Sequence, residues 1–107
     1  MSIKFKTLSQ LKELLEKKEL SSYELVSETF RNISSSKTNS FITLNEEAAI
    51  NKAKYYDEGK VDGDLAGIPI AQKDLFCTKN LRTTCGSKIL EDFIPPYDAT
   101  VVDNLSK

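Results

Sequence analysis

Apolar residues recur at helical spacing in the first part of the chain. Thr7 and Gln10 have the spacing of a capping box, in which each side chain binds a backbone N–H group of the other. The apolar residues that follow share one helical face, and they are Leu8, Leu11, Leu14 and Leu15. The pattern predicts an amphipathic helix from Leu8 to about Lys18.

A second segment repeats the same signature. Ser21 and Glu24 form another capping-box pair, and a run of serines at 34–36 breaks the pattern that follows them. Between these limits an apolar residue returns every three or four positions, at Tyr23, Val26, Phe30 and Ile33. Two helices with one apolar face each and a short connection predict an αα-hairpin.

The middle of the chain predicts short strands around a third helix. Residues 40–44, SFITL, are rich in aromatic and β-branched side chains and predict a strand. Asn45 can cap a helix that Gly59 ends. The inward residues of this helix are expected to be Ala49, Ala53 and Tyr56. After a turn at 61–64, residues 68–71 form a second apolar run of strand type.

The last part of the chain is less regular and richer in hydroxyl groups. Gly86 and Ser87 can start a short helix, which the prolines at 95–96 prevent from continuing far. Thr100, with Asp103 at the capping-box distance, predicts a final helix. That helix has a start signal and no stop signal, so we expect a fragment of a longer protein.

Composition limits the possible classes of function. The chain has 107 residues, of which 39% are hydrophobic, so it can form one ordinary domain at most. Its 15 basic and 16 acidic residues are spread evenly and offer no basic stripe for nucleic acid. No apolar run approaches the roughly 20 residues that cross a bilayer, and the N-terminal sequence has no signal core. We expect a soluble, cytoplasmic protein that does not contact a membrane.

The chain contains no histidine, which excludes Ser-His-Asp and Cys-His catalysis by these residues alone. Any general base must be Lys, Asp, Glu or Tyr. Cys77 and Cys85 have neither zinc nor thioredoxin spacing, so we expect reduced thiols and no metal site. Three nearby hydroxyl residues are predicted to be turn and cap groups rather than nucleophiles, and they are Thr83, Thr84 and Ser87.

Residues 64–76, DLAGIPIAQKDLF, are the best candidate for chemistry. An uncharged run leads directly to Lys73 and Asp74. One interpretation is a strand-end lysine that is ion-paired with Asp74 or another carboxylate. The other is a desolvated lysine that acts as a base toward a serine hydroxyl. The residues alone leave both open, and the ion pair is the simpler.

Two segments resemble the amidase signature family. Residues 63–74, GDLAGIPIAQKD, are similar to its G-I/V-P-x-x-x-K-D segment. Residues 83–102, TTCGSKILEDFIPPYDATVV, resemble one branch, the A subunits of the glutamyl-tRNA(Gln)/aspartyl-tRNA(Asn) amidotransferases. The likeness covers nearly the whole chain and is weaker before Gly63. Three local departures are Gln72 for an aliphatic residue, Leu75 for Asn and Gly86 for Ala.

The resemblance implies an α/β fold, with a large mixed sheet flanked by helices. Residues 1–107 would be the N-terminal portion of one such domain, without an internal boundary. It also implies a Ser–Ser–Lys triad in which Lys73 is the lysine. Lys73 would take a proton, through a bridging serine in a cis peptide, from a nucleophilic serine that attacks the carboxamide of glutamine and releases ammonia.

Both family serines lie in a downstream segment rich in glycine and serine that this chain does not contain. The resemblance therefore implies a fragment that contributes only Lys73 and is inactive alone. No cofactor-binding or metal-binding residue is expected in it.

In the branch that residues 83–102 resemble, the ammonia passes to a different subunit of the complex. There, ATP and Mg are used to convert Glu-tRNA(Gln) or Asp-tRNA(Asn) to the amide. The implied partners are subunits B and C, with tRNA contacted mainly through them. Two alternatives stay open, a stand-alone amidase and a non-catalytic truncated interaction module. In isolation the fragment is expected to self-associate, because two short strands are marginal in water.

Overall fold

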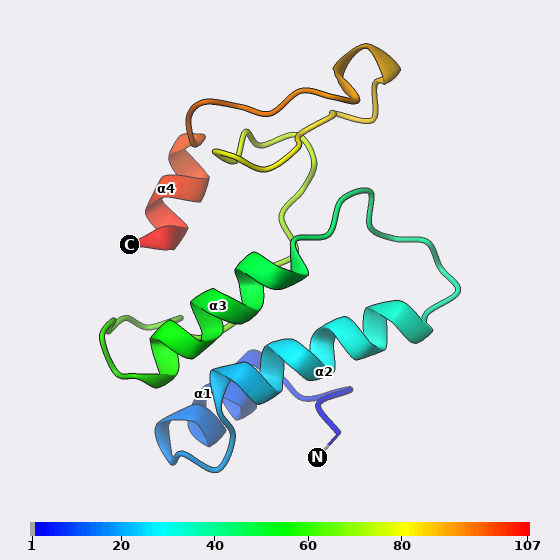
Figure 1. Cartoon of the computed structure of the whole chain (residues 1–107). Coiled ribbons are helices and arrows are strands. Elements are labelled where there is room, and N and C mark those ends of the chain that lie inside the picture. The colour runs from blue at the N-terminus through cyan, green and yellow to red at the C-terminus, as the bar shows by residue number, and fades with distance from the viewer. Residues whose placement is uncertain (1) are drawn as a thin grey trace. The chain divides into compact units, whose positions relative to one another are not determined.

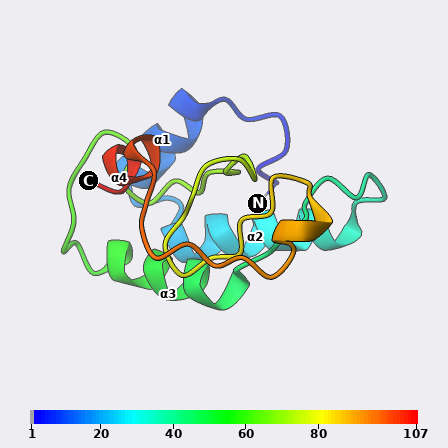
Figure 2. The same cartoon turned by 90° about the horizontal axis from the view of Figure 1, so that it is seen from above.

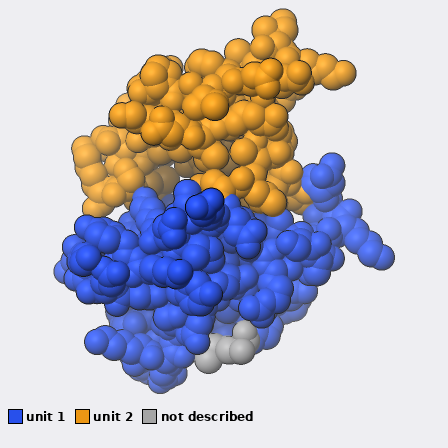
Figure 3. All heavy atoms as spheres, in the orientation of Figure 1, with its two compact units in different colours: residues 1–39, 46–70 blue, residues 40–45, 71–107 orange. Residues whose placement is uncertain are grey.

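The computed structural model describes residues 2–107, and the chain separates into two compact units (Figure 3). Unit 1 comprises the residues up to 39 together with residues 46–70. Unit 2 comprises residues 40–45 and 71–107. Residues 40–45 therefore belong to unit 2, although unit 1 flanks them in the sequence.

Unit 1 contains three helices, α1 (Leu8–Glu16), α2 (Ser22–Ser35) and α3 (Glu46–Asp57) (Figure 1). Both predicted capping boxes are confirmed, because α1 and α2 begin after Thr7 and Ser21 with reciprocal side-chain bonds. The end of α1 comes two residues earlier than predicted, since the chain turns at Lys18, whose φ is 57°.

The core of unit 1 lies between α2 and α3, which run antiparallel and side by side (Figures 1 and 2). Its buried and half-buried apolar residues are Val26, Phe30, Ile33, Ala49, Ile50 and Ala53. The predicted αα-hairpin of the first two helices is therefore wrong, because α2 packs chiefly against α3. The prediction that Tyr23 belongs to the buried face is also wrong, since it is 44% exposed, whereas Leu25, Val26 and Phe30 of α2 are buried.

The N-terminus of α2 has three of its free N–H groups satisfied by side chains. The Ser21 hydroxyl accepts from Glu24 N at 3.0 Å. The carboxylate of Asp57, the last residue of α3, accepts from Ser22 N at 2.7 Å and Tyr23 N at 2.9 Å. A helix start leaves such groups without intrahelical partners, so Asp57 joins the two core helices by capping one with the end of the other.

Unit 2 is made of loops with a short 3₁₀ helix, η1 (Lys88–Leu90), and helix α4 (Thr100–Ser106). Ser87 caps η1 through its hydroxyl, as the sequence predicts. The predicted capping box of α4 is wrong, because Thr100 is already helical and Ala99 occupies the cap position without a side-chain bond.

Neither predicted strand is present in residues 2–107, where the β-structure is limited to a bridge between Thr78 and Leu81. Residues 40–44 and 68–71 are irregular. A strand needs a hydrogen-bonded neighbour, and these segments are instead held by turns and side chains. The described part of the chain thus consists of four α-helices, one short 3₁₀ helix and loops, and the sheet expected of an α/β fold is not observed in it.

Unit 2 leaves many large apolar side chains exposed, including Ile89 at 94% and Ile94 at 59%. Others on this unit are Phe41, Ile42, Leu44, Leu75, Tyr97, Val101 and Leu105.

Among the helices of residues 2–107, none combines the length and apolar character needed to cross a lipid bilayer.

Asp57→Ala is expected to lower the free energy of unfolding by about 1–2 kcal/mol, because it removes an acceptor for two N–H groups at the start of α2. Urea denaturation at neutral pH measures the change. Asp64→Ala is the matched control, since the Asp64 carboxylate is 99% exposed and makes only an ion pair with Lys12. Equal stability of the two variants would contradict the cap.

The 107-residue chain by itself is expected to self-associate, because the exposed apolar side chains of unit 2 gain free energy when they leave water. Sedimentation velocity over a range of concentrations measures this, and a monomer throughout that range would contradict it. Ile89→Lys should weaken the association, whereas Lys88→Glu, on the same 3₁₀ helix, removes no apolar surface.

Candidate functional site

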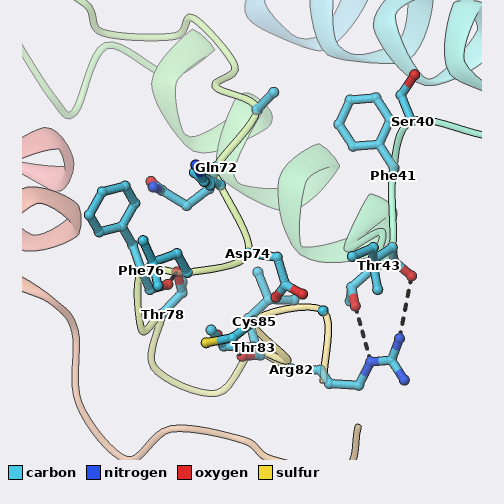
Figure 4. Close-up of a pocket in the computed structure, with 16 residues that line it drawn as sticks. Ser40, Phe41, Thr43, Gln72, Asp74, Phe76, Thr78, Arg82, Thr83 and Cys85 are labelled. Carbon is cyan, nitrogen blue, oxygen red and sulfur yellow. Dashed lines mark hydrogen bonds between the residues drawn. The ribbon is translucent and has the colours of Figure 1, made fainter. Parts of the chain in front are cut away.

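A cavity of about 660 Å³ lies within unit 2 (Figure 4). Its wall is formed by residues 40–43, residues 71–76 and parts of 78–86. The lining is mostly apolar, with the cations Lys73 and Arg82 and the anion Asp74 among it. A largely apolar cavity with a few charged groups is the usual form of a small-molecule site.

Lys73 lies on the wall of this cavity, at the beginning of a turn. Its carbonyl accepts from Phe76 N at 3.1 Å, which closes the turn over residues 73–76. The side chain is exposed, and the ion pairs of residues 2–107 do not include it. The predicted ion pair between Lys73 and a carboxylate is therefore absent.

Gln72 also lines the cavity and is half-buried. Strand alternation would have placed Gln72 and Lys73 on opposite sides of a sheet. Because residues 71–73 form no strand, both residues border the same space.

The carboxylate of Asp74 binds Thr84 instead of Lys73. Its Oδ1 accepts from Thr84 N at 2.8 Å, and its Oδ2 accepts a hydrogen bond from the Thr84 hydroxyl. The backbone carbonyl of Asp74 accepts from Cys85 N at 2.8 Å. This set of three bonds is called here the Asp74 clamp. Thr84 is only 4% exposed, so two of the three bonds satisfy donors of a residue that water hardly reaches.

Thr84 also begins the turn that Asp74 holds. Ser87 N donates to the Thr84 carbonyl at 2.9 Å, and the central residues Cys85 and Gly86 have φ values of 53° and 69°. Positive φ at both central residues is the type I′ geometry, in which glycine carries no steric penalty. Gly86 N in turn donates to the Thr84 hydroxyl oxygen at 3.1 Å.

Desolvation acts to raise the pKa of Asp74, but opposing effects outweigh it. Hydrogen bonds from the Thr84 side chain and backbone and from the Gly86 backbone, with the charge of Arg82, lower the pKa of Asp74 below its ordinary value. The clamp therefore contains an ionised carboxylate at neutral pH.

Arg82 attaches residues 40–45 to the rest of unit 2, as the dashed lines of Figure 4 show. Its guanidinium donates to Thr43 Oγ1 at 3.1 Å and to the Ile42 carbonyl at 3.4 Å. A third bond, of 3.0 Å, goes to the Glu91 carbonyl. Sequence reasoning missed Arg82, because two of these partners are about 40 positions away and no local pattern marks them.

The predicted hydroxyl roles are confirmed. Thr83 donates to the Leu81 carbonyl at 3.1 Å, Thr84 belongs to the Asp74 clamp, and Ser87 caps η1.

Both cysteines are free thiols, and Cys77 donates to the hydroxyl of Tyr97 at 3.5 Å. Within residues 2–107, no group of three or more Cys, Asp or Glu side chains is arranged to hold a metal ion.

Comparison with known proteins finds one matching family model, described as Amidase, over residues 24–107. The chain is also similar to the A subunit of the glutamyl-tRNA(Gln) amidotransferase from Coxiella burnetii (strain RSA 493 / Nine Mile phase I). The two are 49% identical over 107 residues, which cover 95% of this chain and 22% of that protein.

The corresponding subunits of other bacteria give similar results. The one from Methylobacillus flagellatus is 45% identical over 105 residues, covering 94% of this chain and 21% of the relative. The one from Psychrobacter cryohalolentis is 50% identical over 98 residues, covering 87% and 20%. The chain thus spans about one fifth of the length of the curated relatives it matches.

The Asp74 clamp should make the stability of the protein pH-dependent. Because the pKa of Asp74 is lowered in the folded state, its contribution is complete above the ordinary carboxyl value of about 3.9 and is lost as the pH falls through the lowered value. Asp74→Asn should therefore destabilise the protein more at about pH 6 than at about pH 2.

Urea midpoints of the wild type and of Asp74→Asn at the two pH values measure this dependence. Asp98→Asn is the matched control, because the Asp98 carboxylate also accepts a backbone bond, from Lys79 N at 2.6 Å, outside the cavity wall. A difference between wild type and Asp74→Asn that is the same at both pH values would overturn the clamp as its cause.

Proposed function

The chain belongs to the amidase family, and from this membership we propose that it is the N-terminal part of the glutamine-hydrolysing A subunit of a tRNA-dependent amidotransferase. The observation that carries the proposal is the 49% identity to such a protein over 107 residues. The whole protein would release ammonia from glutamine, and the ammonia would convert Glu-tRNA(Gln) or Asp-tRNA(Asn) to the amide.

In this proposal Lys73 is the lysine of a Ser–Ser–Lys triad. Its position on the wall of a mostly apolar cavity supports the role, because a substrate carboxamide bound there would lie near the amine. The Lys73 side chain makes no ion pair within residues 2–107, so no carboxylate there competes with the bridging serine for its amine.

The two serines would come from chain beyond Lys107, in a segment rich in glycine and serine. The bridging serine would pass the proton of the nucleophilic serine to Lys73, and the nucleophile would form an acyl-enzyme with glutamine. Residues 1–107 alone would be inactive, because they supply neither a nucleophile nor donors for the oxyanion.

The proposal extends to the fold and the partners of the whole protein. Residues 1–107 would form part of a single amidase domain, and residues 40–44 and 68–71 would join a large mixed sheet when its other strands are present. Subunits B and C would complete a cytoplasmic complex and make most of the contacts to tRNA. ATP and Mg would be used elsewhere in that complex, with no cofactor bound by this chain.

The reading frame after Lys107 provides the first test. A continuation that contains a glycine- and serine-rich segment with two spaced serines is expected. A stop codon directly after Lys107 would overturn the proposal and favour a non-catalytic interaction module. Release of ammonia from other amides, but not from glutamine, would indicate a stand-alone amidase.

Lys73→Ala in the full-length protein is expected to reduce ammonia release from glutamine to the background rate, because the proton of the nucleophilic serine loses its acceptor. Ammonia production in the assembled enzyme measures this, and gel filtration should show intact assembly. Lys88→Ala is the matched control, since Lys88 is exposed on unit 2 and does not line the cavity. Near-normal activity of Lys73→Ala would refute the triad role.

A further inference from the structure

We propose that Asp74 is a positioning residue for Lys73, an inference that rests on the proposed function of Lys73. Asp74 is held by residues 84–85 through the Asp74 clamp, and this contact fixes the backbone from which the Lys73 side chain extends. The role is separate from that of the lysine itself, because Asp74 would act through the backbone and through its own sequestered charge.

A positioning residue is needed because the Lys73 side chain is not held by an ion pair. This side chain is exposed and makes no ion pair within residues 2–107, so no side-chain contact of that kind sets the position of the amine. The neighbouring backbone then fixes the Cα of Lys73 and the direction in which its flexible side chain leaves the main chain. Lys73 begins a turn closed by the Phe76 N–H group, and Asp74 is the second residue of that turn.

The Asp74 clamp fixes this turn from two directions. The side chain accepts two bonds from Thr84, and the main-chain carbonyl accepts one from Cys85 at 2.8 Å. Thr84 is itself nearly inaccessible, and its carbonyl closes the type I′ turn that ends at Ser87. The residue directly after Lys73 is thus bonded, through both its side chain and its main chain, to a second tight turn.

The Asp74 clamp also determines which groups bind the carboxylate of Asp74. A carboxylate next to a lysine in sequence can form an ion pair with it, and such a pair would compete with the bridging serine of the proposed triad for the amine. Here the Thr84 amide and hydroxyl bind one carboxylate oxygen each. Lys73 therefore lines the cavity without an ion pair to the acid that follows it in the sequence.

The test uses the full-length protein in its natural assembly, with glutamine as substrate. Asp74→Asn should lower kcat for ammonia release by about 10- to 100-fold with KM changed less than about 2-fold, because misplacement of a reacting group by about 1 Å has effects of this size. Asp98→Asn is the matched control, since it weakens a carboxylate contact to a backbone N–H elsewhere in unit 2 and should keep the wild-type kcat.

A second pair of variants keeps the inference testable if Asp74→Asn does not fold. Thr84→Ser retains the hydroxyl donor and should keep kcat near the wild-type value. Thr84→Val preserves the shape and the backbone donor but loses the hydroxyl bond to Asp74, and it should lower kcat. Equal kcat values for Thr84→Ser and Thr84→Val would overturn the inference.

Hydrogen exchange gives a measure that does not depend on activity. The amides of Thr84 and Cys85 donate to Asp74, so the peptide that contains them should exchange faster in Asp74→Asn than in Asp98→Asn. Unchanged exchange would show that the clamp does not hold the turn, and it would overturn the inference.

The activities of Lys73→Ala and Asp74→Asn together distinguish an error in the proposed function from an error in this inference. Retained activity in Lys73→Ala would refute the triad role and the positioning role together. If Lys73→Ala is inactive but Asp74→Asn keeps the same kcat as Asp98→Asn, the proposed function stands and the positioning role is refuted. A large rise in KM at constant kcat would likewise refute positioning of a reacting group.

Discussion

The structure of unit 2 depends on the acceptors that Asp74 provides for Thr84. Thr84 is almost completely buried, and a buried N–H or O–H group without an acceptor costs about 1–3 kcal/mol. In a sheet a neighbouring strand would accept the bond from the backbone N–H group, but unit 2 has only an isolated β-bridge among its described residues. Here the carboxylate of Asp74 accepts the bonds from both the amide and the side-chain hydroxyl of Thr84.

In unit 1 a different carboxylate likewise accepts hydrogen bonds from residues distant in the sequence. Asp57, at the end of α3, accepts from two N–H groups at the start of α2. The hydroxyl of Ser22 then donates to the carbonyl of Gly67 at 2.7 Å, and the two residues approach so closely that a Cβ on Gly67 would lie 3.2 Å from Ser22. A carboxylate distant in sequence thus organises each unit, with apolar packing concentrated between α2 and α3.

The local parts of this fold could be predicted from the sequence. The capping boxes at Thr7 and Ser21 and the cap at Ser87 depend on residues two or three positions apart, and all three are present. The strands at 40–44 and 68–71 could not be predicted correctly, because a strand exists only with a neighbour.

The candidate site was predictable only in part. An apolar run followed by charge marks Lys73 in the sequence, and the structure places it on a cavity wall. The partner of Asp74 was not predictable from that run, because Thr84 is 10 residues away and no periodic pattern connects them. The contacts of Arg82 with Ile42 and Thr43 span about 40 residues and leave no local signal either.

The bond between Arg82 and Thr43 has a consequence for biosynthesis. The two residues are 39 positions apart, so a ribosome that adds about 5–20 residues per second produces Thr43 roughly 2–8 s before Arg82. During that interval Ile42 and Thr43 have been added to the chain, but the guanidinium of Arg82 that binds them has not. The residues of α2 and α3 end at Asp57, so the helices that form the core of unit 1 are synthesised before the arginine that holds residues 42–43.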